Sequence, residues 1–212
     1  MSKKMLSEVA YNALKEKMVN MPSGMYLSAR QCANELGMSY TPVREAFLRL
    51  QREGALRQVP NVGFFVESVD LSDLLQIFQV RECLELFVVD KVFDKLTLEH
   101  VAKMRELCMG QQAMIEEGDS SRYMQLDTEL HEIPFGLLGN KHLSTLYHNV
   151  REQYMMCSVQ VVKTMTTDAL AEHAGFIDAI ERGDKAAALS ELRSHIDGAR
   201  QRMMDGYINK VS

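Results

Sequence analysis

The chain has 212 residues, of which 46% are hydrophobic and 25% are charged, and its formal net charge at pH 7 is −5. This length is enough for two compact domains with cores of their own. No run approaches the roughly 20 apolar residues of a membrane-spanning helix, and the N-terminus lacks the apolar centre of a signal peptide, so we expect a cytoplasmic protein without membrane contact. Its 4 cysteines include no CxxC pair, which argues against a disulfide framework and a zinc ribbon.

Near the N-terminus, apolar side chains recur at helical spacing and predict a first helix that packs beneath the following ones: Leu6, Val9, Ala10, Leu14 and Met18. A second helix is expected after Ser28, which has the form of a capping box with Gln31 three residues later. Gly37 then supplies the residue type that most often ends a helix.

A third helix is expected at Thr41 and Pro42. Thr41 can act as the N-cap, and Pro42 then occupies the first helical position, where its missing N–H has no consequence. This helix runs to Gly54, and the short connection before it completes a helix-turn-helix. Two β-rich runs, ALRQV and GFFVESV, flank residues 60–63 and predict a hairpin. Three helices and a hairpin make a winged helix-turn-helix.

Charge divides the chain after this hairpin. Residues 1–66 hold nine Lys/Arg and five Asp/Glu, a net charge of +4, whereas residues 67–212 hold fifteen and twenty-four, a net charge of −9. DNA phosphates respond to the charge of the face presented to them, so the local surplus favours DNA binding although the whole chain is acidic. By itself, a small basic surplus describes an ordinary solvated surface equally well.

The rest of the chain predicts six helices and no strand, over 71–94, 97–117, 120–138, 141–164, 168–182 and 184–208. The fold class is therefore mainly α, with a winged helix-turn-helix domain at 1–69 and an all-α six-helix bundle at 70–212. Pro134, inside the third of these helices, predicts a kink. The long apolar faces of the first and fourth of them are candidates for contact with a second subunit, and they include Leu84, Val88 and Val92.

Four side chains of the second domain carry metal-ligand chemistry: Asp127, His131, His173 and His195. Asp127 and His131 are four residues apart, so one helix face carries both. The other two histidines lie on separate amphipathic stretches. Three imidazoles and one carboxylate suit zinc, manganese, iron or nickel. Each histidine alone is more often a packed or surface residue, so the prediction depends on the joint pattern.

The residues 27–66 resemble the DNA-binding domain of GntR-family bacterial transcription regulators. The most specific part is TPVREA at residues 41–46, followed by Leu50, Gly54 and Gly63. The resemblance implies that these side chains contact DNA: Arg30, Ser39, Tyr40, Thr41, Arg44, Arg49 and Gly63. The family usually has Arg at the position of Tyr40, where its forked donors bind guanine. Tyr40 lacks those donors, so we expect an operator that departs from the family's usual GT…AC inverted repeat.

The second domain resembles the FCD ligand-binding domain of the FadR-like subfamily, in its shorter, VanR-like branch. The family's Asp-x-x-x-His matches Asp127 and His131, and its two remaining ligand segments match those of His173 and His195. The family often places an Arg over the metal cavity, and Arg81 matches it as an effector-binding residue. The alternative for Arg81 is a surface ion pair with Glu85. For Arg151 a surface position is the favoured interpretation.

These observations predict a homodimeric transcription regulator, by family default a repressor, that binds an inverted-repeat operator in double-stranded DNA. Its helical domain is expected to bind a divalent metal, with zinc preferred over nickel, manganese or iron. It is also expected to bind a small carboxylate or sugar-acid effector that alters operator affinity.

One alternative is a metal-dependent enzyme with a His3Asp site, in which Glu129 and Glu132 supply acid–base chemistry. However, neither glutamate shares the helix face of Asp127. The other alternative is a DNA-binding protein with a purely structural metal.

Overall fold

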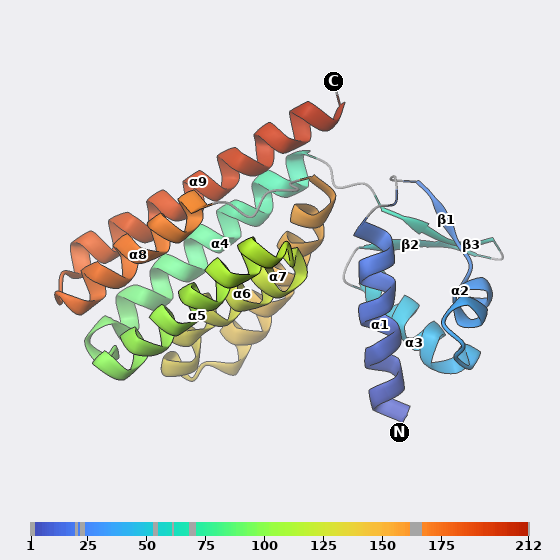
Figure 1. Ribbon diagram of the computed structural model, residues 1–212, viewed down its shortest axis with the longest axis horizontal. Coiled ribbons are helices and arrows are strands. Elements are labelled where there is room, and N and C mark those ends of the chain that lie inside the picture. The colour runs from blue at the N-terminus through green and yellow to red at the C-terminus, as the bar shows by residue number, and fades with distance from the viewer. Residues whose placement is uncertain are drawn as a thin grey trace. The chain divides into compact units, whose positions relative to one another are not determined.

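The computed structural model describes residues 3–19, 21, 24–52, 55–60, 62–67, 71–161 and 167–211. They form two compact units, residues 1–70 with 152–160, and residues 71–151 with 161–212. We call these the N-terminal unit and the helical unit (Figure 1). The predicted domain boundary between residues 69 and 70 lies outside the described residues and stays a prediction. No helix in the described part of the chain is long and apolar enough to cross a membrane.

The N-terminal unit is a winged helix-turn-helix, as predicted. Its elements are α1 (Lys3–Val19), β1 (Tyr26–Leu27), α2 (Ala29–Glu35), α3 (Tyr40–Arg52), β2 (Leu56–Val59) and β3 (Gly63–Val66). The strands form an antiparallel sheet in the order β1-β3-β2, with Tyr26 opposite Phe65 and Leu56 opposite Val66. The hairpin of β2 and β3 was predicted, whereas β1 was not, because two residues are too few to show an alternating pattern.

Helix starts in this unit follow local capping chemistry. Ser28 is the N-cap of α2, as predicted, and its side chain accepts a hydrogen bond from the backbone N–H of Gln31 at 3.4 Å. The predicted capping box was wrong, because the Gln31 side chain donates to Glu35 at 3.0 Å. The predicted N-cap of the next helix was wrong, because α3 begins at Tyr40 and Thr41 lies inside its first turn. Pro42 is therefore the third helical residue. Its missing N–H still has no consequence there, since the first four N–H groups of a helix lack intrahelical acceptors.

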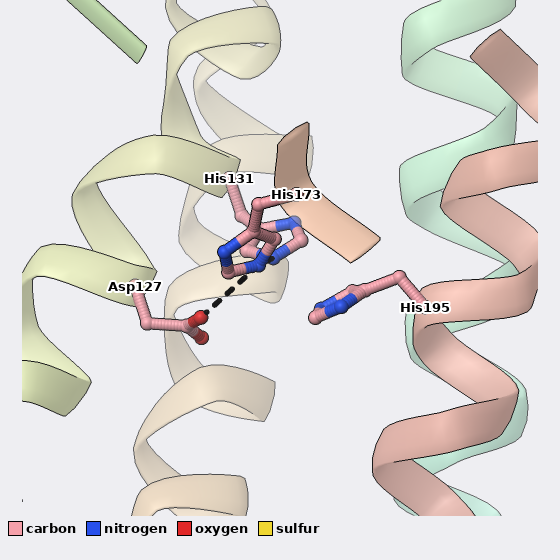
Figure 2. Close-up of side chains that lie close together, drawn as sticks. All are labelled: Asp127, His131, His173 and His195. Atoms are coloured by element: carbon pink, nitrogen blue, oxygen red, sulfur yellow. Dashed lines mark hydrogen bonds and ion pairs between the residues drawn. The ribbon is translucent and has the colours of Figure 1, made fainter. Parts of the chain in front are cut away.

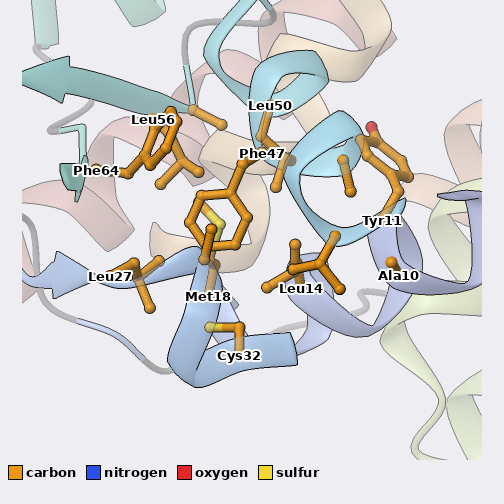
Figure 3. Close-up of a cluster of buried hydrophobic side chains, with 14 of the residues drawn as sticks. Ala10, Tyr11, Leu14, Met18, Leu27, Cys32, Phe47, Leu50, Leu56 and Phe64 are labelled. Carbon is orange, nitrogen blue, oxygen red and sulfur yellow. The ribbon is translucent and has the colours of Figure 1, made fainter. Parts of the chain in front are cut away.

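An apolar core fixes α3 against α1, α2 and the sheet (Figure 3). Leu14 and Met18 of α1, Phe47 and Leu50 of α3 and Phe64 of β3 are all less than 5% exposed. The rings of Phe47 and Phe64 meet edge to face at 4.9 Å between centroids. This core holds one face of α3 and leaves Tyr40 and Thr41, at the start of the helix, exposed.

The six predicted helices follow, and all belong to the helical unit except residues 152–160 of the fourth, which group with the N-terminal unit. They are α4 (Leu71–Val92), which continues into a 3-10 turn at Phe93–Lys95, α5 (Leu98–Glu117), α6 (Ser120–Leu138), α7 (Lys141–Val161), α8 (Thr167–Glu181) and α9 (Lys185–Val211). The predicted end of the fourth helix at residue 164 lies outside the described residues. Gly139 ends α6 in the left-handed conformation (φ +69°) that favours glycine.

Packing within this unit brings α6, α8 and α9 around one centre, since α5 contacts both α6 and α8, α8 contacts α9, and α4 contacts both α6 and α9. Val88 and Val92 of α4 are 0% exposed. The expectation that they contact a second subunit was therefore wrong, because they belong to the core of their own unit. Pro134 lies within α6, which continues through it.

Candidate metal centre and nucleic-acid interface

The structure brings the four predicted ligands together inside the helical unit (Figure 2). Asp127 and His131 come from α6, His173 from α8 and His195 from α9, and all four are buried. One ligand atom from each lies within 4.8 Å of all the others. Side chains separated by up to 68 residues of sequence thus form one cluster with three imidazoles and one carboxylate.

The distances fit a metal ion. His131 Nε2 lies 3.3 Å from His173 Nε2, and His173 Nε2 lies 3.3 Å from Asp127 Oδ1. In a tetrahedron with metal–ligand bonds of about 2.0–2.1 Å, neighbouring ligand atoms are about 3.3–3.4 Å apart. Two edges of the cluster already have this length. The donor set of nitrogen and oxygen suits zinc and the other metals predicted from the sequence.

Glu85 of α4 orients the first imidazole. Its Oε2 lies 2.8 Å from His131 Nδ1, and its Oε1 accepts a hydrogen bond from Arg81 Nε at 2.9 Å. A carboxylate on Nδ1 requires the proton there, so Nε2 is left to coordinate. Burial raises the pKa of Glu85, but the charges of Arg81 and His131 outweigh it and hold the pKa below its usual range. The carboxylate is therefore ionised.

Glu172 of α8 orients a second imidazole in the same way. Its Oε2 lies 3.0 Å from His195 Nδ1, and Arg202 of α9 holds both of its oxygens at 2.7 Å. Burial raises the pKa of Glu172, but the hydrogen bonds from Arg202 and His195 outweigh it and lower the pKa to about 2. Two of the three imidazoles thus have a carboxylate partner that is itself fixed by an arginine.

Asp127 has two further partners. Arg151 of α7 forms an ion pair with its Oδ2, and Gln111 of α5 donates from Nε2 to its Oδ1 at 3.2 Å. Burial raises the pKa of Asp127, but Arg151 and the neighbouring histidines hold it well below its usual range. The preference for Arg151 at the surface was wrong, because its side chain is 0% exposed. Nothing in the sequence around Arg151 indicated that its side chain would be buried against Asp127.

The cluster keeps imidazoles in the form that binds metal. Burial lowers the pKa of His173 well below its usual value, and the neighbouring His195 lowers it further. Burial also lowers the pKa of His195, although its hydrogen bond with Glu172 opposes the shift. Metals bind neutral imidazole and ionised carboxylate. Burial thus favours the neutral form of His173 and His195, and the charge of Arg151 favours the ionised form of Asp127.

Arg81 does not lie at the surface, where the alternative prediction placed it. It pairs with Glu85, as that alternative expected, but the side chain is 0% exposed and its guanidinium carbon lies 5.6 Å from the centre of the Phe78 ring. It therefore reaches the metal cluster through Glu85 and His131. Its predicted contact with an effector stays a prediction.

The predicted DNA-contacting residues lie mainly at the start of α3 and on α2. Ser39, Tyr40 and Thr41 are exposed, and Arg44 is half-buried. Arg30 is exposed on α2, with its guanidinium carbon 6.0 Å from the centre of the Tyr40 ring. The aromatic ring that replaces the family's arginine is thus next to another arginine.

Two of the predicted DNA contacts have structural partners. Arg49 donates to Glu8 at 2.9 Å and lies 3.7 Å over the Tyr11 ring, so it is held against α1. Gly63 has φ +149°, and a Cβ there would lie 2.5 Å from the Tyr26 ring, so only glycine fits without displacing the ring. Their contacts with DNA stay predictions.

Comparison with known proteins is consistent with both units. The model for bacterial regulatory proteins of the gntR family matches residues 6–66, and the FCD domain model matches residues 76–198. In Bacillus subtilis (strain 168), the uncharacterized HTH-type transcriptional regulator YdhC is 24% identical over 192 residues, covering 88% of this chain and 86% of that protein. The gluconate operon transcriptional repressor of the same strain is 25% identical over 196 residues, covering 89% and 80%.

Among solved structures, E. coli McbR/YncC superposes with a TM-score of 0.79 at 23% sequence identity, covering 95% of this chain and 98% of that chain. At this identity the likeness shows the fold, with a winged helix-turn-helix and a helical bundle in the same order.

Proposed function

The chain belongs to the gntR family of bacterial regulatory proteins and carries an FCD domain, and on this premise we propose that it is a metal-dependent repressor. As a family member it is a DNA-binding transcriptional regulator. Its homologues and fold neighbours are transcriptional regulators, so the enzyme alternative is abandoned. Its place in the VanR-like branch is part of the proposal.

The observation that carries the proposal is the buried cluster of Asp127, His131, His173 and His195. We assign it to a divalent metal, with zinc first and nickel, manganese or iron as alternatives. Three ionised carboxylates lie in or beside the cluster, and each is paired with one arginine. The pairs are Asp127 with Arg151, Glu85 with Arg81, and Glu172 with Arg202. These charges cancel, so a bound divalent cation adds a net positive charge. A buried positive charge favours an anionic ligand.

The proposed effector is therefore a small carboxylate or sugar acid. Arg81 is our candidate for a second contact to its carboxylate, because it is buried beside the ion pair that orients His131. A relative of similar length is named as the repressor of a gluconate operon, which is consistent with an acid of this size. When bound, the metal would supply Lewis-acid binding of the effector's oxygen.

DNA contact is assigned to the exposed start of α3 and the neighbouring α2. Arg44 is proposed to reach a base edge or a flanking phosphate, with Ser39 and Thr41 on phosphates and Arg30 assisting from α2. Arg49 and Gly63 complete the proposed set, and Tyr40 is expected to alter base preference. The operator is proposed to be an inverted repeat, because two copies of the chain present two recognition helices.

A homodimer is proposed through the exposed face of α4. Val80 and Phe87 are 37% and 49% exposed, and Cys83 between them is exposed as well. Spacings of three and four residues place all three side chains on one helix face. Phe87→Asp is expected to convert dimer to monomer in sedimentation velocity, with Leu98→Asp at another exposed apolar site as the control. A dimer that survives Phe87→Asp would contradict this interface.

Regulation then follows from linkage between the two units. An effector that binds one dimer geometry more tightly shifts the spacing of the recognition helices, which must match half-sites about one helical turn apart. A coupling free energy of about 1–3 kcal/mol changes operator affinity roughly 5- to 150-fold.

The test begins with metal analysis of the purified protein and of His173→Ala. We expect the wild type to contain bound divalent metal and His173→Ala to contain much less. After metal is removed from both proteins and added back, the melting temperature should rise in the wild type but not in the variant. Equal metal content in both proteins would contradict the site. A metal that stabilises the fold, with no carboxylate changing the melting temperature or operator binding, would support the structural-metal alternative.

A further inference from the structure

Several buried polar atoms have no hydrogen-bond partner among the described residues, and besides His173 Nδ1 in the metal cluster itself two of them bear on a ligand. They are the hydroxyl of Tyr147 on α7 and Oε1 of Gln111 on α5. Both side chains are 0% exposed. Buried polar groups in folded proteins are nearly always hydrogen-bonded, so each unpaired one requires an explanation such as a ligand. One of these atoms is on a hydroxyl that donates, and the other is an acceptor.

The amide of Gln111 has a fixed orientation. Its nitrogen donates to Asp127 Oδ1 at 3.2 Å, and an ionised carboxylate can only accept, so the amide oxygen cannot take that place. Oε1 is therefore left as an acceptor beside a metal ligand. The group that satisfies it must carry a proton.

Tyr147 is fixed through its ring. The ring stacks on Phe135 with 4.1 Å between centroids and packs with Val88. Its hydroxyl interacts with the charges of the groups that surround the metal cluster: Glu85, Arg151, Arg81 and Asp127. Burial raises the pKa of Tyr147 well above its usual value. The hydroxyl therefore keeps its proton, and the group that best satisfies it is an acceptor.

We propose that Tyr147 and Gln111 select the effector, and that the effector is a hydroxycarboxylate. Its carboxylate accepts a hydrogen bond from the Tyr147 hydroxyl, and its own hydroxyl donates to Gln111 Oε1. This inference rests on the proposed function, in which the helical unit binds a metal and a carboxylate. A simple carboxylate would leave Gln111 unpaired. An amino acid would bring an ammonium group toward Arg81, Arg151 and a divalent cation, which repel it.

The test compares ligands that differ by one group. Cobalt(II)-loaded protein is titrated with acetate, glycolate and glycine, with binding followed by the cobalt absorption bands and by calorimetry. The variants are Tyr147→Phe, which keeps the ring, and Gln111→Met, which keeps the chain length. Tyr207→Phe removes a tyrosine hydroxyl from a half-buried position on α9 and serves as the control. Cobalt stoichiometry and melting temperature are measured for every protein.

We expect the wild type and Tyr207→Phe to bind glycolate at least tenfold more tightly than acetate or glycine. Sites that hydrogen-bond a ligand hydroxyl discriminate strongly against the analogue without it. Tyr147→Phe should weaken acetate and glycolate alike by about tenfold, which is the usual effect of losing a hydrogen bond to a charged group. Gln111→Met should weaken glycolate and leave acetate within about twofold, so that the preference disappears.

Unchanged affinities in Tyr147→Phe, or an unchanged preference for glycolate in Gln111→Met, would overturn the inference while leaving the proposed function in place. Tighter binding of acetate or glycine than of glycolate by the wild type would do the same. Cobalt-loaded wild type that binds none of the three anions would overturn the inference together with the effector part of the proposed function.

Discussion

The two units bury different kinds of side chain. In the N-terminal unit the buried cluster is apolar, and the predicted DNA-contacting side chains lie mainly at the surface. Among the described residues, the buried charged and polar side chains of the helical unit are Arg81, Glu85, Gln111, Asp127, Thr128, His131, Arg151, His173 and His195, whereas in the N-terminal unit Glu152 is buried and accepts a hydrogen bond from Tyr11. Most of them belong to the metal cluster or to the groups that hold its ligands.

This difference shows where each unit places its chemistry. Burying a charge is unfavourable unless it is paired and hydrogen-bonded, so an ordinary core excludes charges. The helical unit keeps them in a network of ion pairs around its four ligands. The N-terminal unit needs no such network, because phosphates and base edges meet the protein at its surface.

The largest expected effect comes from breaking one buried pair. Arg151→Met should lower the free energy of unfolding of the metal-free protein by about 3–5 kcal/mol, because it leaves the Asp127 carboxylate buried without its cation. Arg44→Met, on the surface of α3, should change it by less than about 0.5 kcal/mol. Urea unfolding followed by circular dichroism measures both. A similar loss of unfolding free energy in the two variants would contradict the proposed difference between a buried charge network in the helical unit and surface charges in the N-terminal unit.

The next effect concerns the carboxylates that orient imidazoles. Glu172→Gln should weaken metal binding about 10- to 100-fold, because an amide holds His195 less firmly and lowers its basicity. The control is Glu82→Gln, which alters only a surface ion pair with Arg193. Competition titration with a chromophoric chelator gives the two affinities. If both variants bind metal as the wild type does, Glu172 has no positioning role.

The corresponding experiment on the N-terminal unit is Arg44→Ala. It should weaken operator binding by about 1–3 kcal/mol if the guanidinium contacts a base edge. Metal content should not change, since Arg44 belongs to the other unit. Fluorescence anisotropy at fixed salt on a selected operator provides the affinity, with Arg200→Ala on α9 as a charge-matched control. Full affinity in Arg44→Ala would remove the recognition-helix assignment.

A smaller effect is expected from Tyr40→Arg. An arginine at this position should improve binding to a GT…AC inverted repeat by about tenfold, because its donors fit guanine O6 and N7. The affinity for the operator selected with the wild type should fall or stay unchanged. Both operators are compared in one gel-shift series, and equal preference in the two proteins would show that Tyr40 does not set specificity.

The fold was predictable because its signals are local. Ser28 with Gln31, and helical apolar spacing through the rest of the chain, placed the helices within a few residues. The exception is the start of α3, where Thr41 was predicted to be the N-cap but lies inside the first turn. Sequence signals such as Thr41 and Pro42 fix the start of a helix only to within one or two residues.

The site was only partly predictable. The clustering of the four candidate ligands could be predicted, because their residue types and a known family pattern agree. The groups that hold the ligands were not, because Gln111, Arg151 and Arg202 approach across helix contacts that leave no fixed spacing in the sequence. Burial of charge depends on partners from other helices, and these appear only in the folded chain.

The most direct test of the account is reciprocity between the two units in the metal-loaded protein. A hydroxycarboxylate identified by calorimetric screening, with glycolate as the starting probe, is titrated in the absence and presence of saturating operator, and operator is titrated without and with the ligand. We expect the ligand to change operator affinity by the same factor by which operator changes ligand affinity, and His173→Ala to abolish both changes. Ligand binding to the metal-loaded protein with no change in operator affinity would contradict it.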